Sequence, residues 1–105
     1  QGKFAEAEPL YIKALSIWET NLGKDHPDVG SCLNNLGDLY SSCGKYEESE
    51  KCYKESLDIF EKKLGRGHLN AITVLENIIE LYKIAGKNEK VVILEEKLRK
   101  IKLGQ

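Results

Sequence analysis

Residues 33–60 read LNNLGDLYSSCGKYEESEKCYKESLDIF, and this stretch holds two helical patterns joined by a glycine. In its first part, leucine and tyrosine recur three or four residues apart, which is the spacing of one face of an α-helix. Gly44 stands where a helix commonly ends with a residue in the left-handed conformation. A second helical pattern begins at Tyr46 and continues to the end of the stretch. The stretch therefore predicts a pair of helices.

The same pattern recurs along the chain at an interval of 42 residues. Gly2-Lys3, Gly44-Lys45 and Gly86-Lys87 mark the interval, and residues 2–29 share eleven identities with residues 44–71. A fixed interval of this length is typical of stacked repeat architectures. Carrying the two helical patterns to each copy predicts helices at residues 4–22, 27–43, 46–64, 70–85 and 88–103.

Five such helices predict an all-α fold, a right-handed α-solenoid of about two and a half repeats. We expect one array over residues 1–105, divided into the second helix of a truncated repeat (2–26), a full repeat (27–68) and a degenerate C-terminal repeat (69–105). Helix 88–103 has one narrow apolar stripe surrounded by charges, which is typical of a capping helix. The first helix is apolar enough to expect another repeat before it, and the chain begins without Met, so we expect a fragment of a longer protein.

Composition excludes several classes of protein. Sixteen basic and seventeen acidic residues give a formal charge of −1, which provides no general attraction to nucleic acid or an anionic membrane. No apolar run is long enough to insert across a bilayer. The three cysteines form no CxxC pair, so we expect reduced thiols that pack as small hydrophobic side chains.

Catalytic, cofactor and metal sites have little support in the sequence. No serine, histidine and carboxylate recur in a catalytic spacing, so we expect no enzyme activity and no cofactor. His26 and His68 occupy matching linkers, but a zinc site needs a third and a fourth ligand. Capping of the helices that follow, or packing, is the preferred interpretation of these two histidines.

The runs LNNLGDLY (from residue 33), GKYEESEKCYKESL (from residue 44) and AEPLYIKAL (from residue 7) resemble the tetratricopeptide repeat. The 42-residue unit is longer than the standard 34-residue unit. With LGKDHPDV at residues 22–29, the long unit resembles the kinesin light chain type of repeat, which also occurs in nephrocystin-like ciliary proteins. Ile79 and Asn88 depart from the pattern, because the preceding copy has Gly37 and Tyr46 at those positions.

The resemblance implies that the first helix of each repeat lines a concave face on which a partner peptide or protein is held. Residues expected on this face are Ser31, Asn34, Asn35, Asp38, Ser41, Ser42, Thr73, Glu76, Asn77, Glu80 and Lys83, and all of these except Ser41 and Thr73 are expected to bind the peptide. Asn35 and Asn77 lie 42 residues apart, and an amide can pair with the backbone of an extended peptide. The alternative is that these asparagines bond neighbouring helices and fix their stacking.

The charge of this face predicts its ligand class. Asp38, Glu76 and Glu80 make the face acidic, with Lys83 as an offset, so a neutral or basic peptide is favoured. Kinesin light chains are similar in architecture but accept acidic, tryptophan-containing cargo motifs, and this chain has no comparable basic cluster there. A solvated polar face without a ligand is the alternative.

Two functions of different classes follow. The first is a protein–protein interaction scaffold or adaptor in the cytoplasm, with association with the cytoskeleton or a cilium left open by the resemblance. The second is a structural spacer or oligomerisation module that associates through Trp18 and Tyr11 of the first helix. Because we expect a fragment, a third hypothesis is that the parent protein is an enzyme or signalling ATPase that carries these repeats as a sensor.

Overall fold

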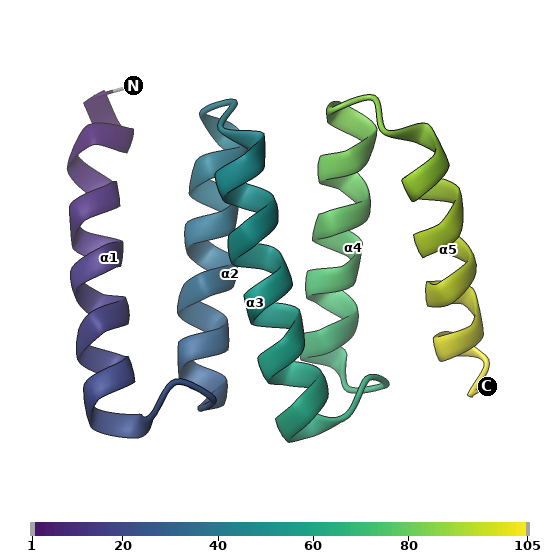
Figure 1. The fold of residues 1–105 in the computed structure, drawn as a ribbon, viewed down its shortest axis with the longest axis horizontal. Coiled ribbons are helices and arrows are strands. Elements are labelled where there is room, and N and C mark those ends of the chain that lie inside the picture. The colour runs from purple at the N-terminus through teal and green to yellow at the C-terminus, as the bar shows by residue number, and fades with distance from the viewer. Residues whose placement is uncertain (1, 105) are drawn as a thin grey trace.

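The structure, a computed structural model, describes residues 2–104, in which it contains five α-helices and no strand. They are α1 (Gly2–Leu22), α2 (Pro27–Ser42), α3 (Tyr46–Leu64), α4 (Leu69–Ile84) and α5 (Asn88–Lys102). The helices run alternately up and down and stack side by side into a slab of 39 × 31 × 15 Å (Figure 1). The predicted all-α solenoid is confirmed, with every helix boundary within two residues of its expected place. Residues 1 and 105, the ends of the predicted array, lie outside the described residues.

Helices α2 and α3 pack closely because α2 has glycines at the contact. A Cβ atom at Gly37 would lie 2.6 Å from the Tyr53 ring, and one at Gly30 would lie 3.0 Å from the Phe60 ring. Both rings are almost fully buried. The absence of a side chain on α2 is therefore what lets the aromatic side chains of α3 reach the α2 backbone.

Two buried serines of α3 reinforce this contact. The Oγ of Ser49 donates a hydrogen bond to the carbonyl oxygen of Gly37, and the Oγ of Ser56 donates to that of Gly30, each at 2.7 Å. Both serines are fully buried, so an unpaired hydroxyl there would be costly. Glycine and serine thus form matched positions that hold α2 and α3 together.

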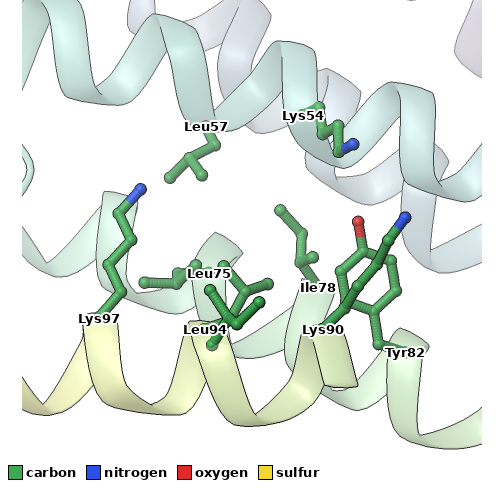
Figure 2. A pocket seen from close by; sticks show the side chains of 9 residues that line it. Lys54, Leu57, Leu75, Ile78, Tyr82, Lys90, Leu94 and Lys97 are labelled. Atoms are coloured by element: carbon green, nitrogen blue, oxygen red, sulfur yellow. The ribbon is translucent and has the colours of Figure 1, made fainter. Parts of the chain in front are cut away.

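Helices α4 and α5 are packed less closely. Ile72 and Ile79 take the places that the two glycines occupy in α2, and Val91 and Leu98 take those of the two serines. Larger side chains keep the two backbones apart. A groove of about 290 Å³ lies between α3 and α5, and residues of α4 also line it (Figure 2).

A tyrosine–glutamate contact joins each helix pair to the helix before it. The hydroxyl of Tyr40 in α2 donates to Glu8 in α1 at 2.7 Å, and the hydroxyl of Tyr82 in α4 donates to Glu50 in α3. The two contacts are related by the 42-residue interval. The repeat in sequence is therefore also a repeat of interhelical hydrogen bonds.

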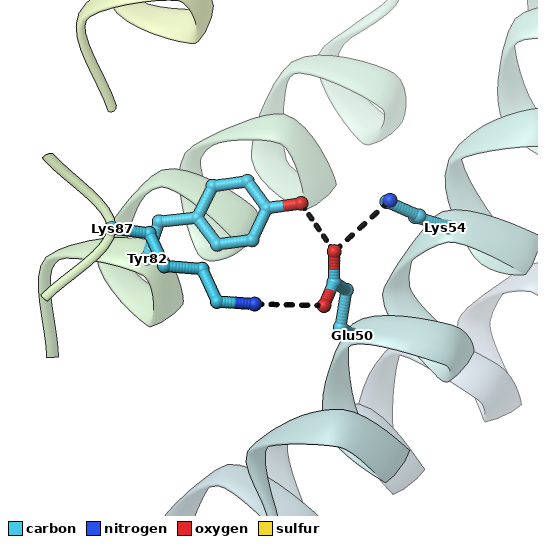
Figure 3. A network of polar contacts seen from close by, with 4 residues as sticks. All are labelled: Glu50, Lys54, Tyr82 and Lys87. Carbon is cyan, nitrogen blue, oxygen red and sulfur yellow. Dashed lines mark hydrogen bonds and ion pairs between the residues drawn. The ribbon is translucent and has the colours of Figure 1, made fainter. Parts of the chain in front are cut away.

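Glu50 is the centre of the second contact (Figure 3). Its carboxylate also forms ion pairs with Lys54 at 3.0 Å and with Lys87 at 3.5 Å. Burial acts to raise the pKa of Glu50, but the hydrogen bonds from Tyr82 and Lys54 and the charges of Lys54 and Lys87 outweigh it and hold the pKa at about 2.

Candidate peptide-binding face

The residues expected to bind a peptide lie on one side of α2 and α4, which we call the α2–α4 face. Ser31, Asn35, Asp38 and Ser42 are exposed on α2, and Glu76, Glu80 and Lys83 are exposed on α4. Asn34 and Asn77 are half-buried where the two helices meet. Helical periodicity places each set on a single side of its helix.

Asn35 and Asn77, the two residues that the sequence most strongly predicts to bind a peptide, differ in their surroundings. The Nδ2 of Asn77 donates a hydrogen bond to the Oδ1 of Asn34 at 2.9 Å, which joins α4 to α2. This is the interhelical contact that the sequence left as the alternative. Asn35 is exposed, and its side chain has no hydrogen-bond partner among residues 2–104. Of the pair, Asn35 therefore has its whole amide available.

Two shallow hollows flank Asn35. One, of about 150 Å³, lies between α2 and α4, and the other, of about 380 Å³, lies between α1 and α2. Ser31 and Asn35 line both. The first hollow also includes Thr73, which the sequence placed on this face, and Asn70, which the sequence did not select.

The second hollow brings together residues that the sequence assigned to different roles. Tyr11 and Trp18 of α1, expected to serve self-association, line it together with Asn35. No local pattern relates residues of α1 to Asn35, since they become neighbours only when the helices stack. The predicted binding face and the predicted oligomerisation surface are thus adjacent.

Much of the charge on the α2–α4 face is paired within the chain. Glu76 pairs with Lys102 of α5 at 3.2 Å, and Lys83 pairs with Glu95 of α5 at 3.4 Å. Glu80 has no such partner among the described residues. With Glu76 and Lys83 paired and Glu80 unpaired, the net charge of the face is mildly negative, as the sequence predicts.

The other two polar residues of this face also make internal contacts. Asp38 accepts a hydrogen bond from the hydroxyl of Tyr53, and burial followed by this contact raises the pKa of that tyrosine. Ser42 donates to the carbonyl oxygen of Leu39 at 2.8 Å. Neither bond removes the side chain from the surface.

The two linker histidines cap helices, as expected. The Nδ1 of His26 accepts a hydrogen bond from the backbone N–H of Asp28, and that of His68 accepts from Asn70, each at 3.0 Å. These bonds satisfy backbone donors at the starts of α2 and α4. Over residues 2–104, no cluster of three or more histidine, cysteine or carboxylate side chains has the arrangement of a metal site.

The expectation that all three cysteines pack as small hydrophobic side chains is wrong for Cys43. Cys32 and Cys52 are buried, and burial raises the pKa of Cys52 to about 11. Cys43 is exposed, because it lies at the C-terminal end of α2, just before the turn at Gly44.

In the part of the chain that the structure describes, no helix is both long and apolar enough to cross a membrane.

Helix pairs that stack through matched contacts every 42 residues define an α-solenoid. The family model of the tetratricopeptide repeat matches residues 1–62 and 38–103, so the chain belongs to the tetratricopeptide repeat family. No curated protein matches the chain.

Solved structures share the fold. BtubC (BKLC) from P. vanneervenii superimposes with a TM-score of 0.88 at 24% identity, over 99% of this chain and 41% of that one. A putative kinesin light chain of Podosopora anserina with nearly identical TPR-like repeats gives a TM-score of 0.83 at 22% identity, over 97% and 48% of the two chains. The chain spans less than half the length of these structures. The expected similarity to kinesin light chain repeats is therefore confirmed for the fold.

Proposed function

We propose that this chain is a non-catalytic scaffold or adaptor that holds a peptide segment of a partner protein on the α2–α4 face. The observation that supports the proposal best is Asn35, an exposed and unpaired amide between two hollows of the face. An amide offers both a donor and an acceptor, so it suits the backbone of an extended peptide. Tetratricopeptide arrays present extended faces of this kind to partners.

The charge of the face favours a neutral or basic peptide. Asp38 and Glu80 are acidic and exposed, whereas the lysine of the face, Lys83, is paired with Glu95. A basic side chain near Glu80 gains an attraction that an acidic one lacks. The ligand class that we propose thus differs in sign from the acidic cargo of kinesin light chains.

Selection of displayed proteome-derived peptides on the chain tests the proposal. The variant is Asn35→Leu, and Asn21→Leu, at an exposed asparagine of α1 outside both hollows, is the matched control. We expect a shared neutral or basic motif that the control enriches and Asn35→Leu loses, with both variants retaining the native helical spectrum. Enrichment indifferent to Asn35→Leu would contradict the proposal.

A second candidate function, self-association through α1, has its own support. Trp18 is 42% exposed, whereas the matching Phe60 is 3% exposed, and Ile17 is 49% exposed against 7% for Ile59. In α3 these side chains lie against Gly30 of the preceding helix α2, and no described helix takes the matching place beside α1. Such an apolar surface favours a partner helix or a second copy of the chain.

Sedimentation over a range of concentrations tests self-association. We expect a concentration-dependent dimer that Trp18→Glu abolishes, because a charge on this surface opposes burial. Thr20→Glu, on an exposed position of the same helix, is the control. A monomer at every concentration would exclude this second function.

A further inference from the structure

The groove between α3 and α5 combines an apolar floor with a basic rim (Figure 2). Its floor is formed by Leu57 of α3, Leu75 and Ile78 of α4, and Leu94 of α5. Lysines from two helices stand around it, namely Lys54 of α3 and Lys90 and Lys97 of α5. Helical periodicity places Leu75 and Ile78 on the side of α4 opposite to Glu76 and Glu80, so this groove is separate from the α2–α4 face.

The repeat supplies an internal comparison for the rim. The matching space between α1 and α3 keeps an apolar floor, with Leu15, Leu33 and Leu36 in place of Leu57, Leu75 and Ile78. The net charge of the rim, however, changes sign between the two spaces. The space between α3 and α5 has Lys54, Lys90, Ile93 and Lys97 at its rim. The matching residues of the first space are, in the same order, Ile12, Glu48, Lys51 and Glu55. The fold is built with either rim, so stacking alone does not account for the three lysines.

The lysines of the groove are incompletely neutralised. Lys97 lies 3.8 Å from Glu61, at the outer limit of an ion pair, and Lys54 shares Glu50 with Lys87 and Tyr82. Lys90 has no carboxylate partner among residues 2–104, and its Nζ lies 5.3 Å from the centre of the Tyr82 ring. Positive charge is therefore available beside the apolar floor.

Apolar surface is also left open at the groove. Ile93 lines it and is 66% exposed, although the matching residue of the preceding copy is Lys51. A further repeat after α5 would not cover this surface. The preceding copy shows why, because α4 follows α3 in the chain and yet does not enter the matching space between α1 and α3. The exposed Ile93 is thus consistent with a contact outside the solenoid itself.

We propose that this groove binds an acidic amphipathic segment of a partner protein. Apolar side chains of the segment pack on the leucines of the floor and on Ile93, and its carboxylates pair with Lys54, Lys90 and Lys97. The two requirements act together, since the rim lysines attract acidic segments and the floor selects those with apolar side chains. The chain then has two binding surfaces of opposite charge preference, on opposite sides of α4.

Fluorescence anisotropy tests this proposal with a labelled peptide of alternating Leu-Leu and Glu-Glu pairs, and with the same peptide carrying Lys for every Glu. The groove variant is Lys90→Glu/Lys97→Glu. The control, Lys13→Glu/Lys24→Glu, changes net charge equally at exposed lysines of α1 and the turn after it, which do not line the groove. A second groove variant, Lys90→Gln/Lys97→Gln, avoids repulsion of Glu61 and serves if the charge-reversed protein loses its helical spectrum.

We expect the acidic peptide to bind the wild-type chain, and the groove variant to weaken it by about tenfold or more, because truncated and reversed charges lose attraction at close range. The control should change affinity by about twofold or less, since its exposed charges lie on α1 and the turn after it, α1 contacts neither α4 nor α5, and salt screens these charges. Ile93→Lys should also weaken binding although it adds positive charge. Asn35→Leu should have no effect, which separates this groove from the α2–α4 face.

Four results would overturn the proposal. Three are no binding of the acidic peptide, equal binding of the lysine peptide, and an equal loss of affinity in the groove and control variants. The fourth is tighter binding to Ile93→Lys, which would show that charge alone attracts the peptide, without use of the groove.

Discussion

Single residues set the spacing of the helices in this chain. Gly30 and Gly37 allow Phe60 and Tyr53 to reach the backbone of α2, and where isoleucine replaces glycine in α4 the next helix is held further away. The choice of side chain at a few contact positions therefore decides how closely the two helices of a pair approach each other. Adding a single methyl group at Gly37 tests this conclusion.

Gly37→Ala should destabilise the fold although alanine favours helices. The new Cβ would lie 2.6 Å from the Tyr53 ring, which is buried and has little room to move. Overpacking of this kind costs about 1–3 kcal/mol, and the higher helix propensity of alanine returns about 1 kcal/mol. The free energy of unfolding in urea measures the net loss.

Gly67→Ala is the control for this substitution. Its Cβ would meet nothing within 4 Å, and Gly67 does not have the positive φ that disfavours alanine. We expect a change of less than about 0.5 kcal/mol. Equal effects at the two glycines would show that the close contact with Tyr53 does not limit position 37.

At the scale of helices, the tyrosine–glutamate contacts fix how each pair sits on the preceding helix. The contact at Glu50 is a half-buried carboxylate with one hydroxyl and two ammonium partners, and the contact at Glu8 has one hydroxyl partner. The pKa of Tyr40 is raised to about 12, first by the hydrogen bond to Glu8. The contact at Glu50 depends on a charged carboxylate, because two of its partners are ammonium groups.

Stability should therefore depend on pH through Glu50. Its pKa is about 2 in the folded protein and 4.5 in a free side chain, so its stabilising effect is complete above about pH 4.5 and is lost as the pH falls toward 2. A shift of that size corresponds to at most about 3 kcal/mol. Urea unfolding of the wild type and of Glu50→Gln at neutral and acidic pH should show a difference that shrinks in acid.

The matched control is Glu47→Gln, at an exposed carboxylate one turn earlier in α3 with no side-chain partner in the described part of the chain. Its difference from the wild type should be small at every pH. A Glu50→Gln difference that stays constant with pH would exclude the carboxylate charge as the source of the stability.

Over the whole molecule, stability should be uneven. Helices α2, α3 and α4 each contribute at least six buried residues, whereas α5 contributes only Val91 and Ile101 and α1 contributes none among its described residues. Local opening requires less free energy where fewer apolar contacts are broken. The centre of the slab should therefore be the last part to open.

Hydrogen exchange followed by mass spectrometry checks this order. Amides of α1 should exchange first, those of α5 next, and those in the centre of α4 last. If the chain associates through Trp18, protection of α1 should rise with protein concentration while that of α5 does not. Uniform exchange over all five helices would show a single cooperative unit instead.

The sequence by itself determined the five helices, their boundaries, the 42-residue repeat, the glycine turns and the histidine caps. Each of these depends on residues near one another in the chain, so periodicity and turn chemistry are sufficient. The repeat also predicted which side of α2 and α4 carries the polar residues.

Only the tertiary structure decided which polar groups meet. The bond from Asn77 to Asn34, the hollow shared by Asn35 and Trp18, and the lysines that α3 and α5 bring around one groove all join residues far apart in the sequence. Such contacts depend on the distance and rotation between helices, which the packing of glycine against tyrosine or of isoleucine against valine sets. A periodic pattern gives the face on which a side chain lies, and only packing gives its partner.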